Sequence, residues 1–133
     1  MFLQLEKTYT YNGSAGPYNF PADWFPMNCA GYDTVAITIY AATGFDGTIS
    51  FWGGAGASQN SPALWGVNDA SDASSLVTQV TSSVGATPTQ YAHNFRGSVA
   101  GLAEFGVYLA DPVTFESVVG TVTVEVGFYS SAK

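Results

Sequence analysis

The sequence predicts an all-β protein: an antiparallel, two-sheet β-sandwich of jelly-roll-like character with about seven or eight strands. Apolar and polar residues alternate with a period of two along several short segments, and turn-forming residues separate those segments. No segment shows convincing helical periodicity. A chain of 133 residues is long enough for one substantial core, so residues 1–133 are expected to form a single sandwich domain.

The first three predicted strands lie in the N-terminal half of the chain. Residues 2–11 (FLQLEKTYTY) place Leu and Tyr on one parity and Gln, Glu and Thr on the other. Residues 33–41 (DTVAITIYA) and 47–53 (GTISFWG) alternate in the same way. The intervening residues 43–48 (TGFDGT) contain two glycines and an aspartate, which predicts a hairpin between these two strands.

Four further strands are predicted in the C-terminal half. Residues 75–82 (SLVTQVTS) give a weak strand signal, whereas 90–97 (QYAHNFRG) and 103–110 (AEFGVYLA) alternate clearly. The clearest case is 120–129 (GTVTVEVGFY), where Val and Phe face inward while Thr and Glu face outward. Residues 68–76 (NDASDASSL) are compatible with one short helical turn capped by an aspartate.

Residues 12–31 (NGSAGPYNFPADWFPMNCAG) do not alternate. They contain three prolines, which exclude a central strand, and they are rich in aromatic residues. Residues 1–31 are therefore expected to form an N-terminal strand followed by a Pro-containing aromatic lead-in. The lead-in either closes one edge of the sandwich or reaches onto a neighbouring subunit.

The charge composition excludes several kinds of partner. Charged residues make up 10% of the chain and the net charge is −7, with Lys7, Arg96 and Lys133 as its cations. Nucleic acids and anionic membranes are recognised by clustered basic residues, so neither is an expected partner. The opening residues MFLQLEK have no cationic start and no apolar run of about seven residues, so synthesis in the cytoplasm without a signal peptide is expected.

The scarce reactive side chains do not form a recognisable catalytic or metal motif. The single histidine, His93, alternates with Tyr91 and Phe95, which predicts a structural histidine on an aromatic face. Arg96 has the opposite parity and should leave the other face of the sheet. Cys29 is alone, so it is expected to be a buried apolar residue rather than half of a disulfide. No enzymatic activity, cofactor or metal is expected.

Two tryptophans suggest an alternative in which the chain binds sugars. Trp52 has the opposite parity to Ile49 and Phe51, and Trp65 lies in an irregular stretch, so either ring can be exposed. Exposed aromatic rings are platforms on which sugars stack. Each tryptophan can equally cover a sheet edge or fill a subunit contact.

The order of motifs resembles that of small β-sandwich virion proteins of tailed bacteriophages, including head decoration, or cement, proteins. An aromatic lead-in (YNFPADWFPMN) is followed by AGYDTVAITIYA, GTISFWGG, TQYAHNFRGSVAGLAEFGVYL and the closing strand GTVTVEVGF. The similarity spans about residues 18–128 and rests on strands and turns. The strand after Leu102 departs from these proteins, because Glu104 and Gly106 stand where basic residues are often found.

The resemblance implies a non-enzymatic decoration protein on the outer surface of the phage head. It would bind the major capsid protein at capsomer junctions and would stabilise the shell. It also implies a homo-oligomer, a trimer in preference to a dimer. The expected contact residues are in the first strand, the aromatic lead-in and the fifth predicted strand: Phe2, Leu3, Leu5, Tyr18, Phe20, Trp24, Phe25 and Arg96. The alternative is a carbohydrate- or receptor-binding module of a head or tail fibre, with Trp52 and Trp65 as its platforms.

Overall fold

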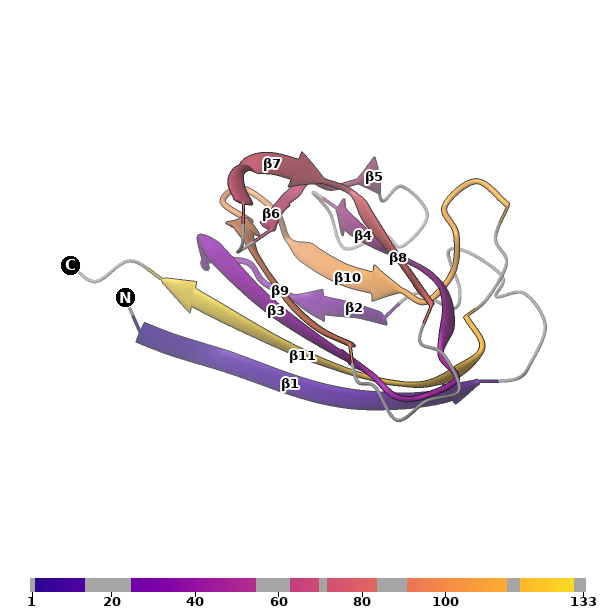
Figure 1. Ribbon diagram of the computed structural model, residues 1–133. Helices are drawn as coiled ribbons and strands as arrows, with labels where there is room; N and C mark the ends of the chain where they lie inside the picture. Colours follow the sequence, from indigo (N-terminus) through magenta and orange to yellow (C-terminus); the bar gives the residue numbers. More distant parts are fainter. Residues whose placement is uncertain are drawn as a thin grey trace.

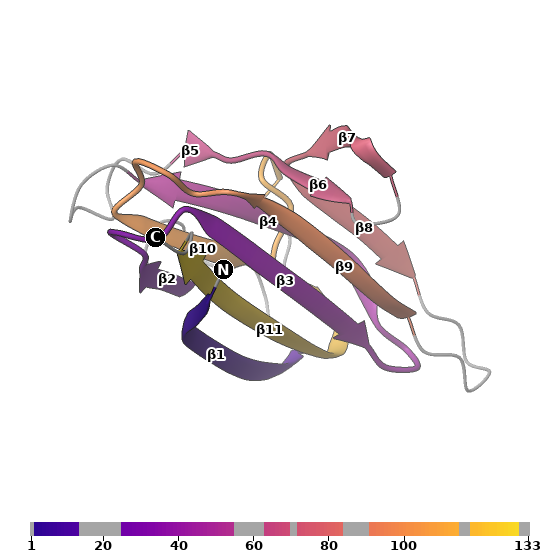
Figure 2. The same ribbon diagram turned by 90° about the vertical axis from the view of Figure 1, so that its left-hand side faces the viewer.

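The structure is a computed structural model of the whole chain. It describes residues 2–13, 25–54, 63–69, 72–83, 91–114 and 118–130, and for 2–13, 25–26, 72–75, 82–83 and 91 it describes the backbone. These residues form two antiparallel β-sheets that pack face to face (Figures 1 and 2). The predicted β-sandwich is confirmed.

Sheet A has six strands in the order β1-β11-β3-β9-β6-β7. Its long central strands are rich in Val, Ile and Thr, the β-branched residues that pack well on a pleated surface. The bounds of its strands are β1 Phe2–Gly13, β3 Thr34–Ala41, β6 Val67–Asp69, β7 Asp72–Val77, β9 Tyr91–Ser98 and β11 Gly120–Ser130.

Sheet B has five strands, with the order β2-β10-β4-β5 and with β8 also paired to β4. The bounds of its strands are β2 Phe25–Asn28, β4 Asp46–Gly54, β5 Ala63–Leu64, β8 Gln79–Ser83 and β10 Glu104–Tyr108. The strand β2 comes from the aromatic lead-in and lies at the edge of sheet B. Pro26 is tolerated there because an edge strand has one side without a ladder partner.

The connectivity is that of a jelly roll with an insertion. Without β5, β6 and β7, eight strands remain, and they form the orders β1-β11-β3-β9 and β2-β10-β4-β8. Numbered from one to eight along the chain, these orders are 1-8-3-6 and 2-7-4-5. Successive strands therefore alternate between the two sheets, except that the fourth and fifth (β4 and β8) pair within sheet B. The inserted β6 and β7 extend sheet A beyond β9, while β5 makes a two-residue pairing with β4.

This alternation corrects the hairpin predicted for residues 43–48. The strands on either side of this turn, β3 and β4, lie in different sheets. The turn itself is present, because the amide of Phe45 donates to the carbonyl of Ala42 and Gly44 has a φ of 89°. Gly120 packs so closely against this turn that an added Cβ would lie 2.8 Å from the Cα of Phe45.

Three further details differ from the predicted pattern. The described residues contain eleven strands rather than seven or eight, because the insertion adds short ones. Residues 72–77 are a strand, where a helical turn was predicted. The first strand has a register shift between Leu3 and Leu5, which places Leu3 opposite Tyr129 and Leu5 opposite Phe128. These two leucines therefore do not share the parity that the sequence pattern assigned to them.

The core lies between the sheets. Phe105 of sheet B packs edge-on against Phe128 of sheet A, with ring centroids 6.2 Å apart, and Phe51 packs against Phe95 at 5.2 Å. Around these pairs are fully buried aliphatic side chains from both sheets: Val35, Ile37, Ile39, Ile49, Val107, Val122, Val124 and Val126. Each fully buried side chain of this size contributes about 1.5–3 kcal/mol to stability, so the core accounts for the pairing of the two sheets.

Candidate interaction surface

The outer face of sheet A is formed by the outward residues of β3, β9 and β11. These are mostly Thr, Ser, Asn, Ala and Tyr, and the alternation predicted for residues 120–129 is observed, with Val and Phe inward and Thr and Glu outward. Across the three strands the register aligns Asn94, Thr38 and Glu125 in one row and Ala92, Tyr40 and Thr123 in the next. Tyr40 is 44% exposed, near the end of β3, which is the middle strand of the three. We call the outward residues of β3, β9 and β11 the sheet A face.

The outer face of sheet B is different, because two of its central residues are buried. Ser50 and Tyr108 are both 0% exposed, although their parity is opposite to that of the core residues Phe51 and Phe105. Ser50 Oγ donates to the carbonyl of Ala110 (3.1 Å) and accepts a hydrogen bond from Trp52 Nε1 (2.8 Å). This face is therefore buried at Ser50 and Tyr108, while Trp52 and Glu104 on the same face are partly exposed.

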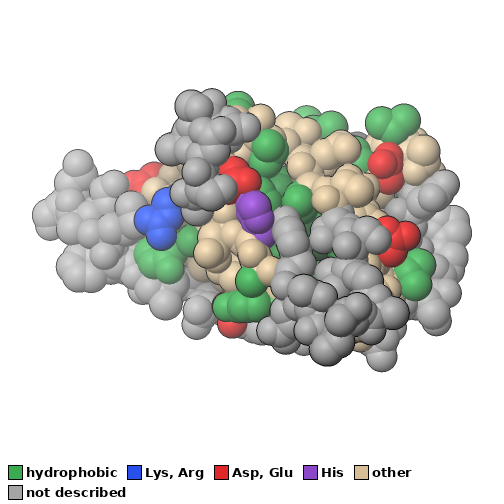
Figure 3. Space-filling model, in the orientation of Figure 1, with side chains coloured by type: hydrophobic (Ala, Val, Ile, Leu, Met, Phe, Trp, Pro, Cys, Tyr) green, Lys and Arg blue, Asp and Glu red, His purple; other side chains and the backbone are tan. Residues whose placement is uncertain are grey.

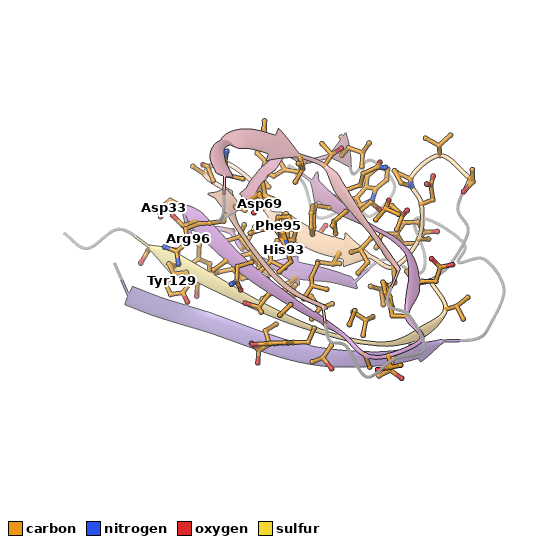
Figure 4. The ribbon with its side chains drawn as sticks, viewed as in Figure 1. Asp33, Asp69, His93, Phe95, Arg96 and Tyr129 are labelled. Atoms are coloured by element: carbon orange, nitrogen blue, oxygen red, sulfur yellow. The ribbon has the colours of Figure 1, made fainter. Side chains whose placement is uncertain are left out.

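Arg96 projects from the sheet A face, as its parity predicted. It is exposed, and it forms no ion pair with any residue in the described part of the chain. Figure 4 shows it between Asp33 and Tyr129, whose backbones are joined by a hydrogen bond of 2.9 Å. Among the described residues the guanidinium is thus without an ion pair, at one end of an almost uncharged face, where it can pair with a carboxylate of a partner.

His93 lies on the opposite side of the same strand from Arg96. Its ring packs on Phe95, with centroids 4.8 Å apart, and its Nε2 contacts the Oδ2 of Asp69 on β6. Asp69 is opposite Phe95 in the register, so it is the diagonal neighbour of His93. Both side chains are about three-quarters buried, with 26% and 22% of their surface exposed. Figure 3 shows the histidine at the surface with an acidic side chain beside it.

This contact accounts for His93 in structural terms. Only two residue pairs, Asn68 with Arg96 and Asp69 with Phe95, join the backbones of β6 and β9. The contact between His93 and Asp69 adds a side-chain link at this short junction and holds the inserted strands against the jelly roll. The sequence pattern placed His93 on an aromatic face, but it gave no means of finding a partner 24 residues away.

Cys29 is buried, as expected from its surroundings. Its thiol donates to the carbonyl of Leu102 at 3.7 Å and none of its surface is exposed. Burial, with the nearby carboxylate of Glu104 adding to the effect, raises the pKa of the Cys29 thiol to about 11. The thiol therefore stays protonated and unreactive at neutral pH.

Both tryptophans proposed as sugar platforms are partly buried. The indole N–H of Trp52 donates to Ser50, and that of Trp65 donates to the carbonyl of Ser98 at 2.8 Å. Trp65 also packs against the core. Each ring has a hydrogen-bonded N–H and a partly exposed surface, so sugar stacking at these positions stays a prediction.

For most of the contact residues expected from the resemblance, the structure describes only the backbone, or the residue lies outside the described ranges. Phe2, Leu3 and Leu5 are in β1, and Phe25 begins β2, where it pairs with Val107. Tyr18, Phe20 and Trp24 lie outside the described residues. Arg96 is thus the expected contact whose side chain can be placed, and it lies on the sheet A face.

No group of acidic, histidine and cysteine side chains suited to holding a metal ion occurs among the described residues. The same part of the chain contains no helix of the length and apolarity that would cross a membrane.

Comparison with known proteins gives a fold rather than a family. No family model matches the chain, and no curated protein matches its sequence. Among solved structures, the crystal structure of the SPBc2 prophage-derived protein YomS superposes with a TM-score of 0.56. The superposition covers 96% of this chain and 97% of that one, with 13% sequence identity. The two proteins share a fold. The likeness extends over the whole sandwich, but a sequence identity of 13% gives no information about individual site residues.

Proposed function

We propose that this chain is a structural protein of a phage virion, most specifically a decoration protein on the outer surface of the head. The observation that carries the proposal is the full-length likeness in fold to a prophage-derived protein. The motif order that resembles decoration proteins supports the same assignment from the sequence.

The surface chemistry agrees with a role in assembly. The sheet A face is broad, nearly uncharged and rich in hydroxyl and amide groups, so packing against a partner costs little charge desolvation. Arg96 supplies a single directional contact on that face. We therefore propose that the sheet A face docks on the major capsid protein at capsomer junctions and that Arg96 pairs with a capsid carboxylate.

The proposal is tested on purified particles of the phage that carries the gene. Mass spectrometry and gold-labelled antibody should find the chain on the head. If the chain is absent from particles, or is confined to the tail, the decoration role is wrong.

Binding to particles that lack the chain tests the role of Arg96. Arg96→Gln should weaken binding about tenfold or more, a loss of about 1.4 kcal/mol or more, because a charge-assisted hydrogen bond is removed. Val113→Glu is the matched control, since it makes the same change of net charge at a side chain that is 80% exposed in a loop away from the sheet A face. Equal losses for both variants would show that net charge alone matters and would contradict a specific contact.

Glycan binding is a second candidate, favoured by the exposed ring of Tyr40. This ring lies beside Thr123 in the register, near the hydrogen bond between Thr38 and Asn94 (2.8 Å). An aromatic ring flanked by hydroxyl and amide groups suits sugar stacking. Retention on a glycan array that is lost in Tyr40→Ala would support this candidate, and no retention of the parent chain would exclude it for the glycans displayed.

A further inference from the structure

The strand β1 has one edge without a described partner. It is the terminal strand of sheet A and pairs along its length with β11. Figures 1 and 2 both show β1 at the border of the sheet with β11 on its inner side. An edge strand presents a row of backbone N–H and C=O groups that can pair with another strand.

This edge is longer and more regular than the other sheet edges. After the register shift between Leu3 and Leu5, nine consecutive residues from Leu5 to Gly13 pair regularly with β11. They include no proline. In contrast, the edge strand β2 has four residues and contains Pro26, and β7 at the opposite border of sheet A has six. Two of the usual protections against strand addition, a short edge strand and a proline, are thus absent from β1.

We propose that β1 pairs antiparallel with β1 of a second copy of this chain, around a two-fold axis at Tyr9. A second copy is the occupant that fits best, because it supplies a strand of the same length with the same regular stretch. The β7 of another copy would leave part of the stretch unpaired. The result is a twelve-stranded sheet, two copies of the six strands of sheet A, with an isologous interface.

The charged residues of β1 and the pairing register together favour one position of the two-fold axis along the strand. A two-fold axis perpendicular to the sheet keeps each residue on its own face, so paired residues have the same parity. An axis at Glu6 or at Lys7 would place like charges directly opposite each other, which is destabilising. An axis at Tyr9, the middle of the regular stretch, pairs Lys7 with Tyr11.

The remaining pairs of this register are also compatible. They join Leu5 with Gly13, Glu6 with Asn12 and Thr8 with Thr10, while Tyr9 meets its own copy. Aromatic pairs and pairs of threonines are among the favourable cross-strand combinations. Because the axis is perpendicular to the sheet, the sheet A faces of both copies point the same way. If the proposed function holds, the dimer then presents two docking faces to one shell and gains affinity from simultaneous binding.

Single cysteines introduced into the full chain test the register. The parent chain is the control for Cys29, which is buried. Under mild oxidation Tyr9→Cys should form a covalent dimer, because directly opposed residues have Cα atoms about 4.5–5.5 Å apart, within reach of a disulfide. Lys7→Cys alone should not, because its two copies would lie about 14 Å apart, four residues along the strand. A mixture of Lys7→Cys and Tyr11→Cys should form the mixed dimer.

A second pair of variants tests the same register without replacing Tyr9, in case Tyr9→Cys does not fold. A mixture of Thr8→Cys and Thr10→Cys should cross-link, whereas each variant alone should cross-link much less. Sedimentation of the unmodified chain over a concentration series should give twice the monomer mass. A monomer or trimer mass, or Lys7→Cys cross-linking as readily as Tyr9→Cys, would overturn the pairing. These readings do not involve particles, so a monomer that still labels phage heads would refute the pairing and leave the proposed function standing.

Discussion

The outer faces of the two sheets differ in accessibility, although their sequences alternate in a similar way. On sheet A the outward residues of β3 and β9 are exposed or half-buried, as with Tyr40 and Arg96. On sheet B the outward residues Ser50 and Tyr108 are fully buried. The contrast shows that a period of two identifies the faces of a strand but does not say which of them meets solvent. Among the described residues of β3, β9, β4 and β10, the more accessible outward side chains are those of β3 and β9 in sheet A.

The largest expected effect contrasts the two outward tyrosines. Tyr108→Ala should lower the free energy of unfolding by about 3–5 kcal/mol, the cost of truncating a buried aromatic side chain. Tyr40→Ala should cost about 1 kcal/mol, because the side chain is only partly buried and the change mainly loses strand propensity and cross-strand contact. Urea unfolding of both variants measures the difference. Similar losses for the two would mean that the faces are equally buried and would remove the contrast.

An intermediate effect is expected for the two outward hydroxyls. Ser50→Ala removes two buried hydrogen bonds, one from the indole N–H of Trp52 and one to the carbonyl of Ala110, which should cost about 1–3 kcal/mol. Thr38→Ala removes an exposed hydrogen bond to Asn94 and should cost about 0.5 kcal/mol or less. Thermal unfolding of both variants gives the comparison. If Ser50→Ala left the stability unchanged, water would be shown to replace Ser50 as the hydrogen-bond partner of these two groups.

The smallest effect concerns thiol chemistry at neutral pH. Cys29 should not react with a thiol reagent in the folded chain at pH 8, whereas Ser98→Cys on the sheet A face should provide a second thiol that reacts at once. Reaction of both thiols at similar rates would contradict the burial of Cys29.

The raised pKa of Cys29 also gives a pH dependence. The folded value of about 11 lies above the ordinary value of 9.0, so folding favours the protonated thiol. The contribution to stability is complete below pH 9 and is lost as the pH rises toward 11. Unfolding curves at increasing pH should show this loss in the parent chain and a smaller one in Cys29→Ala.

Local patterning made much of the fold predictable. The alternation in residues 34–41 and 120–130 identified both the strands and their inward faces, because these strands span a core on one side and solvent on the other. The prolines of the lead-in were expected to exclude a central strand, and β2, which contains Pro26, lies at an edge of sheet B. The opposite directions of His93 and Arg96 also followed from strand parity.

The rest depends on contacts between distant residues. The turn at residues 43–48 has hairpin chemistry, yet turn chemistry does not decide whether the strands on either side pair with each other. The contact of His93 with Asp69 requires the register of β6 on β9, which no local pattern encodes. The inserted strands β5 and β6 have two and three residues, which is too short for periodicity to reveal. The predicted strand 75–82 combined the end of β7 with most of β8, which lie in different sheets.

Cryo-electron microscopy of the phage particle is the most direct test of the central claim that this jelly roll binds the head through the sheet A side. The expected map shows the sandwich on the outer shell, with the sheet A face and Arg96 toward the capsid protein. A particle without this chain would contradict the claim, as would a sandwich bound through the β4 and β10 side of sheet B.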